Sequence, residues 1–93
     1  METYEYRGFY IPERMMIDLD NYLKYGIEPG DFLLSVLCNR GLIDVMDRAD
    51  NENLANLPAY GAYLYNKVPS AAWGSEEKVV AWMARKQAEV ANG

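Results

Sequence analysis

Apolar and polar positions recur at helical spacing along most of the chain after residue 12. In the first stretch, Met15, Leu19 and Tyr22 follow one another every three or four residues, which predicts an amphipathic helix that ends near Gly26. The next run, over residues 32–38, is apolar nearly all round. Such a run is typical of a helix buried at the centre of a bundle.

Two further helices are predicted between residues 42 and 68. In the first of them, Asp44 and Asp47 face solvent, and the narrow apolar face consists of Leu42, Val45, Met46 and Ala49. In the second, heptad-like spacing places one apolar stripe along the helix, made of Leu54, Leu57, Pro58, Gly61, Leu64, Tyr65 and Val68. Gly61 within this stripe would let another backbone approach closely, while Tyr60 and Tyr63 fall on a neighbouring face.

The first eleven residues predict a different local structure. Aromatic and β-branched residues alternate with charges over Tyr4–Ile11, which is typical of a strand. We expect either a short extended arm or a tight hairpin that turns at Arg7 and Gly8. Because two strands alone are marginal in water, this segment must lie on the helices or pair with another chain.

Signals near the other end complete the predicted fold. Pro69 ends the fourth helix, and Ser75 is a favourable N-cap for a fifth. The sequence therefore predicts a single domain over residues 1–93 that is mainly α. We expect a compact bundle of four to five short helices over residues 12–91, preceded by a short N-terminal β-arm or hairpin over residues 1–11.

Composition adds expectations about assembly and about nucleic acid. The 93 residues are 51% hydrophobic and include eight tyrosines, two tryptophans and two phenylalanines, which is more aromatic surface than so small a core needs. We therefore predict self-association, as a homodimer or a higher homo-oligomer. The formal net charge of −5 and the lack of a basic patch argue against direct nucleic-acid binding.

Cysteine content and hydropathy bear on location. Cys38 is the only cysteine, so no intrachain disulfide can form, and no apolar stretch reaches the roughly 18 residues that a membrane span needs. The first ten residues lack the hydrophobic core of a signal peptide. We therefore expect a soluble protein of a reducing cytoplasm that makes no contact with a membrane.

Candidate chemistry is sparse. The chain has no histidine to activate a serine or cysteine nucleophile, and it has no Gly-rich phosphate loop. The closest approach to a metal site is the acidic cluster Asp44, Asp47, Asp50 and Glu52, which lacks the alternating ligands and the glycine of a calcium loop. A solvated, helix-capping face is the better interpretation. We therefore predict no enzymatic activity, no cofactor and no metal.

Protein interfaces are the class of function that remains. Aromatic side chains are enriched at such interfaces, and acidic faces steer the approach of basic partners. The candidate partner-binding residues are Asp44, Asp47, Asp50, Glu52, Tyr60 and Tyr63. The two tyrosines have a second interpretation, in which they cover the small core and leave only their hydroxyl groups in water.

Several short pieces of sequence, in one order, extend from residue 9 to about residue 84. They are Tyr10-Ile11-Pro12-Glu13, Gly26-Ile27-Glu28-Pro29-Gly30-Asp31-Phe32-Leu33, Val36-Leu37-Cys38-Asn39, Arg48-Ala49-Asp50-Asn51-Glu52-Asn53, Leu57-Pro58, Tyr63-Leu64-Tyr65-Asn66, Pro69, and Trp73-Gly74-Ser75 with Trp82. In order and spacing they resemble a family of small uncharacterised proteins encoded by tailed phages and prophages. The resemblance implies a phage product that acts in a bacterial host cytoplasm, and it implies no activity and no site residues.

The phage setting that the resemblance implies and the candidate partner-binding residues together lead to three hypotheses. The first is a non-enzymatic phage accessory protein that binds and modulates or inhibits a host or phage protein, with a bacterial defence component as one such partner. Its acidic face over residues 44–52 could occlude a basic groove of that partner. The second is a homo-oligomer that binds or sequesters a small molecule, such as a nucleotide, in a Tyr-lined interface pocket. The third is a purely structural role in phage assembly.

Overall fold

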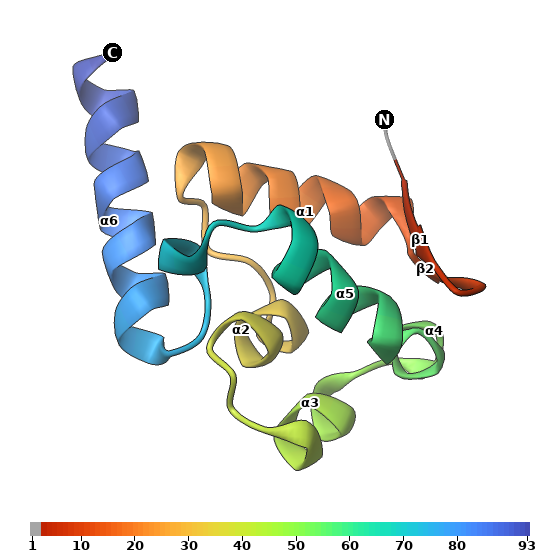
Figure 1. Cartoon of the computed structure of the whole chain (residues 1–93). Helices are drawn as coiled ribbons and strands as arrows, with labels where there is room; N and C mark the ends of the chain where they lie inside the picture. Colours follow the sequence, from red (N-terminus) through yellow and green to blue (C-terminus); the bar gives the residue numbers. More distant parts are fainter. Residues whose placement is uncertain (1–2) are drawn as a thin grey trace.

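The computed structural model of the chain describes residues 3–93, in which a two-stranded β-hairpin is followed by a bundle of helices (Figure 1). The elements are β1 (Tyr4–Tyr6), β2 (Phe9–Ile11), α1 (Glu13–Tyr25), α2 (Asp31–Leu37), α3 (Leu42–Arg48), α4 (Asn51–Ala55), α5 (Leu57–Lys67), the 3₁₀ helix η1 (Ser70–Ala72) and α6 (Glu76–Asn92). The predicted compact, mainly α bundle with a short N-terminal β-element is confirmed. Within the described chain, none of the helices is both long enough and apolar enough to cross a membrane.

Of the two arrangements expected for the first residues, the structure has the hairpin. β1 pairs with β2 in antiparallel fashion, and the turn residues Arg7 and Gly8 have positive φ angles of 53° and 86°. Two consecutive positive φ angles are what the tight turns of twisted hairpins require. The hairpin packs on α5, where the Tyr4 ring meets the Tyr63 ring edge-on at 5.1 Å. The helices therefore cover one side of a hairpin that would be marginal alone.

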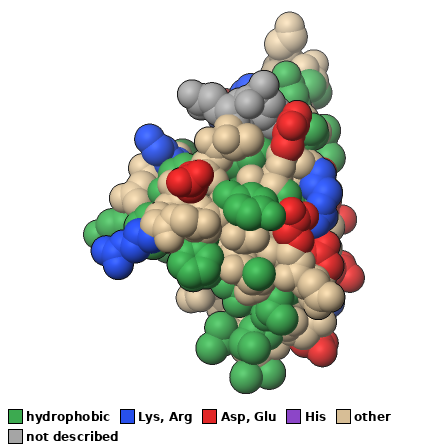
Figure 2. All heavy atoms as spheres, turned by 90° about the vertical axis from the view of Figure 1, so that its right-hand side faces the viewer, with side chains coloured by type: hydrophobic (Ala, Val, Ile, Leu, Met, Phe, Trp, Pro, Cys, Tyr) green, Lys and Arg blue, Asp and Glu red, His purple; other side chains and the backbone are tan. Residues whose placement is uncertain are grey.

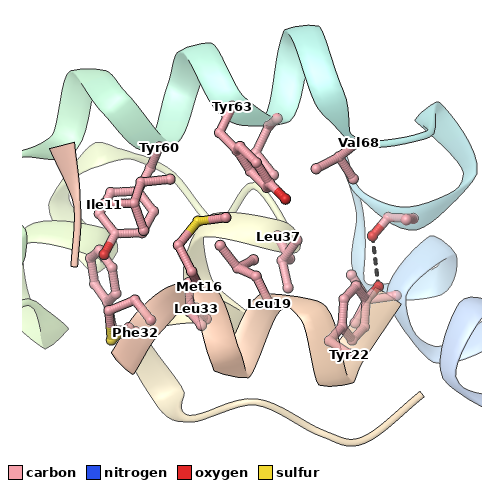
Figure 3. Close-up of a cluster of buried hydrophobic side chains, with 14 of the residues drawn as sticks. Ile11, Met16, Leu19, Tyr22, Phe32, Leu33, Leu37, Tyr60, Tyr63 and Val68 are labelled. Atoms are coloured by element: carbon pink, nitrogen blue, oxygen red, sulfur yellow. Dashed lines mark hydrogen bonds between the residues drawn. The ribbon is translucent and has the colours of Figure 1, made fainter. Parts of the chain in front are cut away.

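The core lies between α1 and α5, which face each other across a cluster of buried side chains to which α2 also contributes (Figure 3). Leu19 of α1 and Leu33 of α2 are almost completely buried there. Tyr22 is buried as well, and its hydroxyl group donates a 2.6 Å hydrogen bond to the carbonyl oxygen of Ala72. In turn, Nε1 of Trp82 donates to the carbonyl oxygen of Tyr22 at 3.2 Å. Tyr22 thus joins α1 to η1 and to α6.

A glycine lets α6 pack closely on the C-terminal end of α1. α1 ends at Gly26, whose φ of 69° is the left-handed cap that the sequence predicted. A Cβ at this position would lie 2.5 Å from the carbonyl oxygen of Met83, and Gln87 Nε2 donates a 2.8 Å hydrogen bond to the Gly26 carbonyl oxygen. α6 begins after the predicted N-cap Ser75, and its last turns extend beyond the body of the molecule (Figure 1).

The segment from residue 50 to residue 68 differs from its prediction in two ways. It divides at Asn56 into α4 and α5, which gives six α-helices over residues 3–93 where four to five were expected. The buried residues of α5 are Ala59, Tyr60, Tyr63 and Leu64. Gly61 and Tyr65, which the predicted stripe placed together on the core side, are exposed. The helix restarts at Leu57 with Pro58 in its first turn, so the positions before the break are out of phase with those after it.

The orientation of α3 also differs from its prediction. None of its seven residues, all of which the structure describes, is buried, and Leu42 of the predicted apolar face is exposed. Asp44 was expected to face solvent, yet it lies toward α2 and accepts a hydrogen bond from the Ser35 hydroxyl group. Ser35 is completely buried, and a buried hydroxyl group needs a partner. Asp44 supplies that partner. Of the predicted apolar face, Val45 and Ala49 pack against the core, while Leu42 and Met46 are exposed.

Candidate protein-binding surface

Two of the four predicted acidic residues, Asp50 and Glu52, are tied to the N-terminal part of the chain. Asp50 is the N-cap of α4, where Oδ1 accepts from the Asn53 N–H at 2.8 Å and Oδ2 accepts from Arg14 Nη2 at 2.8 Å. This backbone N–H, followed by the Arg14 guanidinium, lowers the pKa of the Asp50 carboxyl group. Glu52 accepts from Arg14 at 3.3 Å and from the Tyr10 hydroxyl group at 2.7 Å. These two carboxylates therefore hold α4 against α1 and β2.

The other two acidic residues lie on α3 and differ from each other. The Asp44 carboxylate accepts from the Ser35 hydroxyl group and, at 3.0 Å, from Arg48 Nε. These two hydrogen bonds, the one from Ser35 first, lower the pKa of Asp44. Asp47 is exposed and makes no ion pair with any residue between 3 and 93. Of the four acids, Asp47 is the one most open to a partner.

The predicted acidic face is therefore less negative than its sequence implied. Along the sequence, Arg48 is the only basic residue between Asp44 and Glu52. In the structure Arg14, from a different helix, also bonds to the cluster, so four carboxylates face two guanidinium groups and the net charge is −2. Three of the four carboxylates are engaged in contacts within the fold, which leaves less of this face for electrostatic recognition.

Tyr60 and Tyr63 are buried, which overturns the expectation that they form a surface for a partner. They retain 2% and 9% exposure and point from α5 toward α1 (Figure 3). The Tyr60 hydroxyl group donates to Oδ1 of Asn53, and its ring meets Phe32 edge-on at 5.1 Å. Burial raises the pKa of Tyr60 well above its ordinary value. The second interpretation placed both rings over the core with their hydroxyl groups in water. The rings are buried, as it expected, but the Tyr60 hydroxyl group is buried too.

The structure instead exposes an apolar surface on α3 that sequence reasoning missed. Leu42, Ile43 and Met46 are 65%, 80% and 42% exposed, and we call these three residues the α3 apolar face. Hydrophobic side chains gather at the lower end of the molecule in Figure 2, where α3 lies. The sequence carried a signal for this surface, since four of the seven residues of α3 are apolar and Leu42 adjoins Ile43. Neighbouring residues point about 100° apart on a helix, so one core-facing side cannot hold them all.

A hollow of about 260 Å³ lies beside the α3 apolar face, and we call it the α3–α5 groove. Val36 of α2, Leu42 and Val45 of α3, and Leu57 and Gly61 of α5 contribute to its wall. No described atom, apart from the backbone of its own helix and its chain neighbours, lies within 4 Å of the point where a Cβ on Gly61 would stand. The missing side chain of Gly61 thus keeps the groove open.

Charges around the groove are mostly paired within the fold. Arg48 bonds to Asp44 and lies 3.6 Å from Asp31, and Arg40 Nε lies 2.7 Å from Glu76 Oε1. The Arg40 guanidinium lowers the pKa of the Glu76 carboxyl group. Both arginines close to the groove are therefore already engaged with carboxylates.

Other chemistry is little supported by the described residues. Among residues 3–93, no three Cys, Asp or Glu side chains come together in a way that could hold a metal ion. Cys38 is buried, and burial raises the pKa of its thiol group, which opposes formation of a reactive thiolate. Comparisons with protein families, with curated proteins and with solved structures found no match for this chain.

Proposed function

We propose that this chain is a non-enzymatic accessory protein that binds another protein and modulates or inhibits it. The binding surface in this proposal is the α3 apolar face together with the α3–α5 groove. The tyrosine surface expected from sequence has no part in it, because Tyr60 and Tyr63 lie inside the fold.

The outward orientation of α3 is the observation that carries the proposal. Isolated apolar residues on a surface are ordinary, but contiguous patches of a few hundred Å² commonly mark an interaction site. Leu42, Ile43 and Met46 are exposed together on α3, and Leu42 also lines the hollow. A helix of seven residues gains little stability from its own propensity, so an apolar side turned to water favours a role in contact with a partner.

The charges near the α3 apolar face indicate which kind of partner surface is favoured. The chain has a formal net charge of −5, and Asp47 lies one helical turn beyond Ile43 with no ion pair among the described residues. Exposed charges at the rim of an interface act mainly on the association rate and on partner choice. A partner surface with positive charge would be favoured, as the acidic face led us to expect, but the contribution comes chiefly from Asp47.

The biological setting in the proposal rests on the sequence resemblance alone. The order of pieces from Tyr10 to Trp82 resembles small proteins encoded by tailed phages and prophages. We therefore propose a phage product in a bacterial host cytoplasm, and a host protein, such as a component of a defence system, as the partner.

A second candidate function, a homo-oligomer that holds a small molecule, is favoured by the α3–α5 groove and by another hollow of about 300 Å³ whose lining includes Tyr4 and Tyr63. The hollow of about 260 Å³ is just below the roughly 300 Å³ at which ligand pockets begin. Its Ser35 hydroxyl group is already bonded to Asp44. The aromatic surplus behind the expected self-association is also smaller than it looked, since Tyr22, Tyr60 and Trp82 are buried.

Capture from bacterial lysate tests the proposal. The tagged chain, its Ile43→Ser variant and its Val90→Ser variant would be incubated with lysate of a bacterial host, and retained proteins identified by mass spectrometry. Val90 is a matched control, because it is 53% exposed but lies near the end of α6. Both substitutions keep the charge and replace one exposed β-branched residue.

We expect one host protein to be retained in stoichiometric amount by the original chain and by Val90→Ser, and to be lost with Ile43→Ser. Retention of the same protein by all three chains would remove α3 from the binding surface. A chain that retains no protein but carries a bound metabolite would support the second candidate instead.

A further inference from the structure

We propose that the α3–α5 groove takes a single large apolar side chain from a basic, amphipathic helical segment of the partner. This inference rests on the proposed function and adds the chemistry of the occupant. Three features of the groove lead to it: its size, the secondary structure of its wall, and the charges beside it.

The size of the groove suits one anchoring side chain. An apolar cavity of about 150 Å³ is already large enough to bind benzene. A hollow of about 260 Å³, lined by Val36, Val45 and Leu57, is therefore large enough for one indole ring or branched aliphatic chain. The exposed Leu42 and Ile43 beside it would exclude water from such an anchor, as the surroundings of binding hot spots do.

The backbone around the groove argues for a helical occupant. Most of the wall consists of helical residues, and no strand of the described chain contributes to it. In the loop between α2 and α3, the Asn39 N–H donates to the Val36 carbonyl oxygen, and the Gly41 carbonyl oxygen accepts from the Val45 N–H. Because the wall has no sheet edge, an extended segment finds no strand to pair with, and the occupant has to satisfy its own N–H and C=O groups. An α-helix does so, and laying its apolar side into a groove is a common mode of recognition.

The rim charges argue for a basic occupant. Asp44 accepts a hydrogen bond from Ser35 of the groove wall and pairs with Arg48, while Asp47 on the same helix has no ion pair among the described residues. The formal net charge of the chain is −5. Lysine or arginine residues on the polar side of the segment would complement this rim. A second copy of the chain is the less suitable occupant, because each copy has a formal net charge of −5.

Fluorescence anisotropy with designed peptides tests the inference directly. The probe is a labelled amphipathic peptide of about 16 residues, long enough to be helical, with one tryptophan at the centre of its apolar side and about four lysines on its polar side. Two control peptides replace the tryptophan by alanine or all the lysines by glutamate. The protein variants are Gly61→Leu, whose added side chain occupies the groove, and the control Val90→Ser.

We expect saturable binding of the probe by the original chain and by Val90→Ser. Binding should weaken by about tenfold or more with either control peptide and with Gly61→Leu, and rising salt should weaken the binding of the lysine probe. Because nothing outside its own helix backbone and chain neighbours lies within 4 Å of a Cβ at Gly61 among the described residues, Gly61→Leu should not lower the thermal midpoint. A loss of peptide binding by this folded variant would then report on the groove and not on stability.

Several results would overturn the inference. These are no saturable binding by the original chain, equal binding by Gly61→Leu, or equal affinities for the lysine and glutamate peptides. Light scattering that shows a dimer broken by Ile43→Ser would assign the surface to a second copy instead. If the lysate capture still depends on Ile43 in any of these cases, the proposed function stands and only the mode of docking fails.

Discussion

Replacing Gly61 by alanine should stabilise the protein. Gly61 lies in the middle of α5, and no described atom beyond its helix backbone and chain neighbours stands within 4 Å of the new Cβ. The substitution therefore removes backbone freedom from the unfolded chain without a clash in the folded one. Alanine in a helix interior is favoured over glycine by about 0.5 to 1 kcal/mol. For a domain of 93 residues, 1 kcal/mol corresponds to a rise of roughly 4 to 8 °C in Tm.

The same substitution at Gly26 provides the matched control. There φ is 69°, and the new Cβ would stand 2.5 Å from the carbonyl oxygen of Met83. A left-handed conformation alone costs about 1 to 2 kcal/mol for a residue with a Cβ, and α6 would also have to shift. Thermal unfolding followed by circular dichroism should show Gly61→Ala above the original chain and Gly26→Ala well below it. A lower Tm for Gly61→Ala would mean that another backbone does pack on Gly61, as the predicted stripe required.

Three further predictions follow from the buried and charged contacts. Tyr60→Phe should lower the free energy of unfolding in urea by about 1 to 3 kcal/mol, because Oδ1 of the buried Asn53 loses its donor. As the control, Tyr65→Phe alters an exposed ring and should change the free energy of unfolding by less than about 0.5 kcal/mol. The pKa of Asp50 is lowered in the folded state from an ordinary value of 3.8, so its stabilising contribution is present above that pH and is lost as the pH falls through the folded-state pKa. The gap in Tm between the original chain and Asp50→Asn should therefore close on acidification, and a gap that is constant with pH would contradict this. Chelator and reductant should leave Tm unchanged, since Cys38 is the only cysteine and no cluster of side chains within residues 3–93 could hold a metal ion. A lower Tm with chelator would reveal a cation site.

The ends of the helices could be predicted from sequence because the signals for them are local. Gly26 stops α1 by adopting a left-handed conformation, and Ser75 caps α6. Each signal depends on the chemistry of one residue and its immediate neighbours. The hairpin turn at Arg7 and Gly8 was predictable for the same reason.

The candidate site could not be predicted to the same extent, because it depends on which side of each helix meets the core. Periodicity groups residues on a face, but tyrosine is amphipathic, and only Asn53, seven residues earlier, explains how Tyr60 lies inside. In α3, Asp44 was expected to face solvent but binds the buried Ser35 hydroxyl group, and Leu42 and Met46 of the predicted apolar face are exposed. Such pairings join different helices, and apolar spacing within one helix carries no information about them.

The contacts of Tyr22 have a consequence for synthesis on the ribosome. Its hydroxyl group donates to Ala72, 50 residues later, and its carbonyl oxygen, which also accepts from the nearby Gly26 N–H, accepts from Trp82, 60 residues later. Until those residues have emerged, a nascent chain holds α1 with the Tyr22 hydroxyl group lacking its acceptor and with one side of its core open. Folding should therefore finish late and as one unit, since long loops must close before these contacts form. Chains broken off before Trp82 would keep an open core and be removed by proteases, so that complete molecules accumulate in preference to fragments.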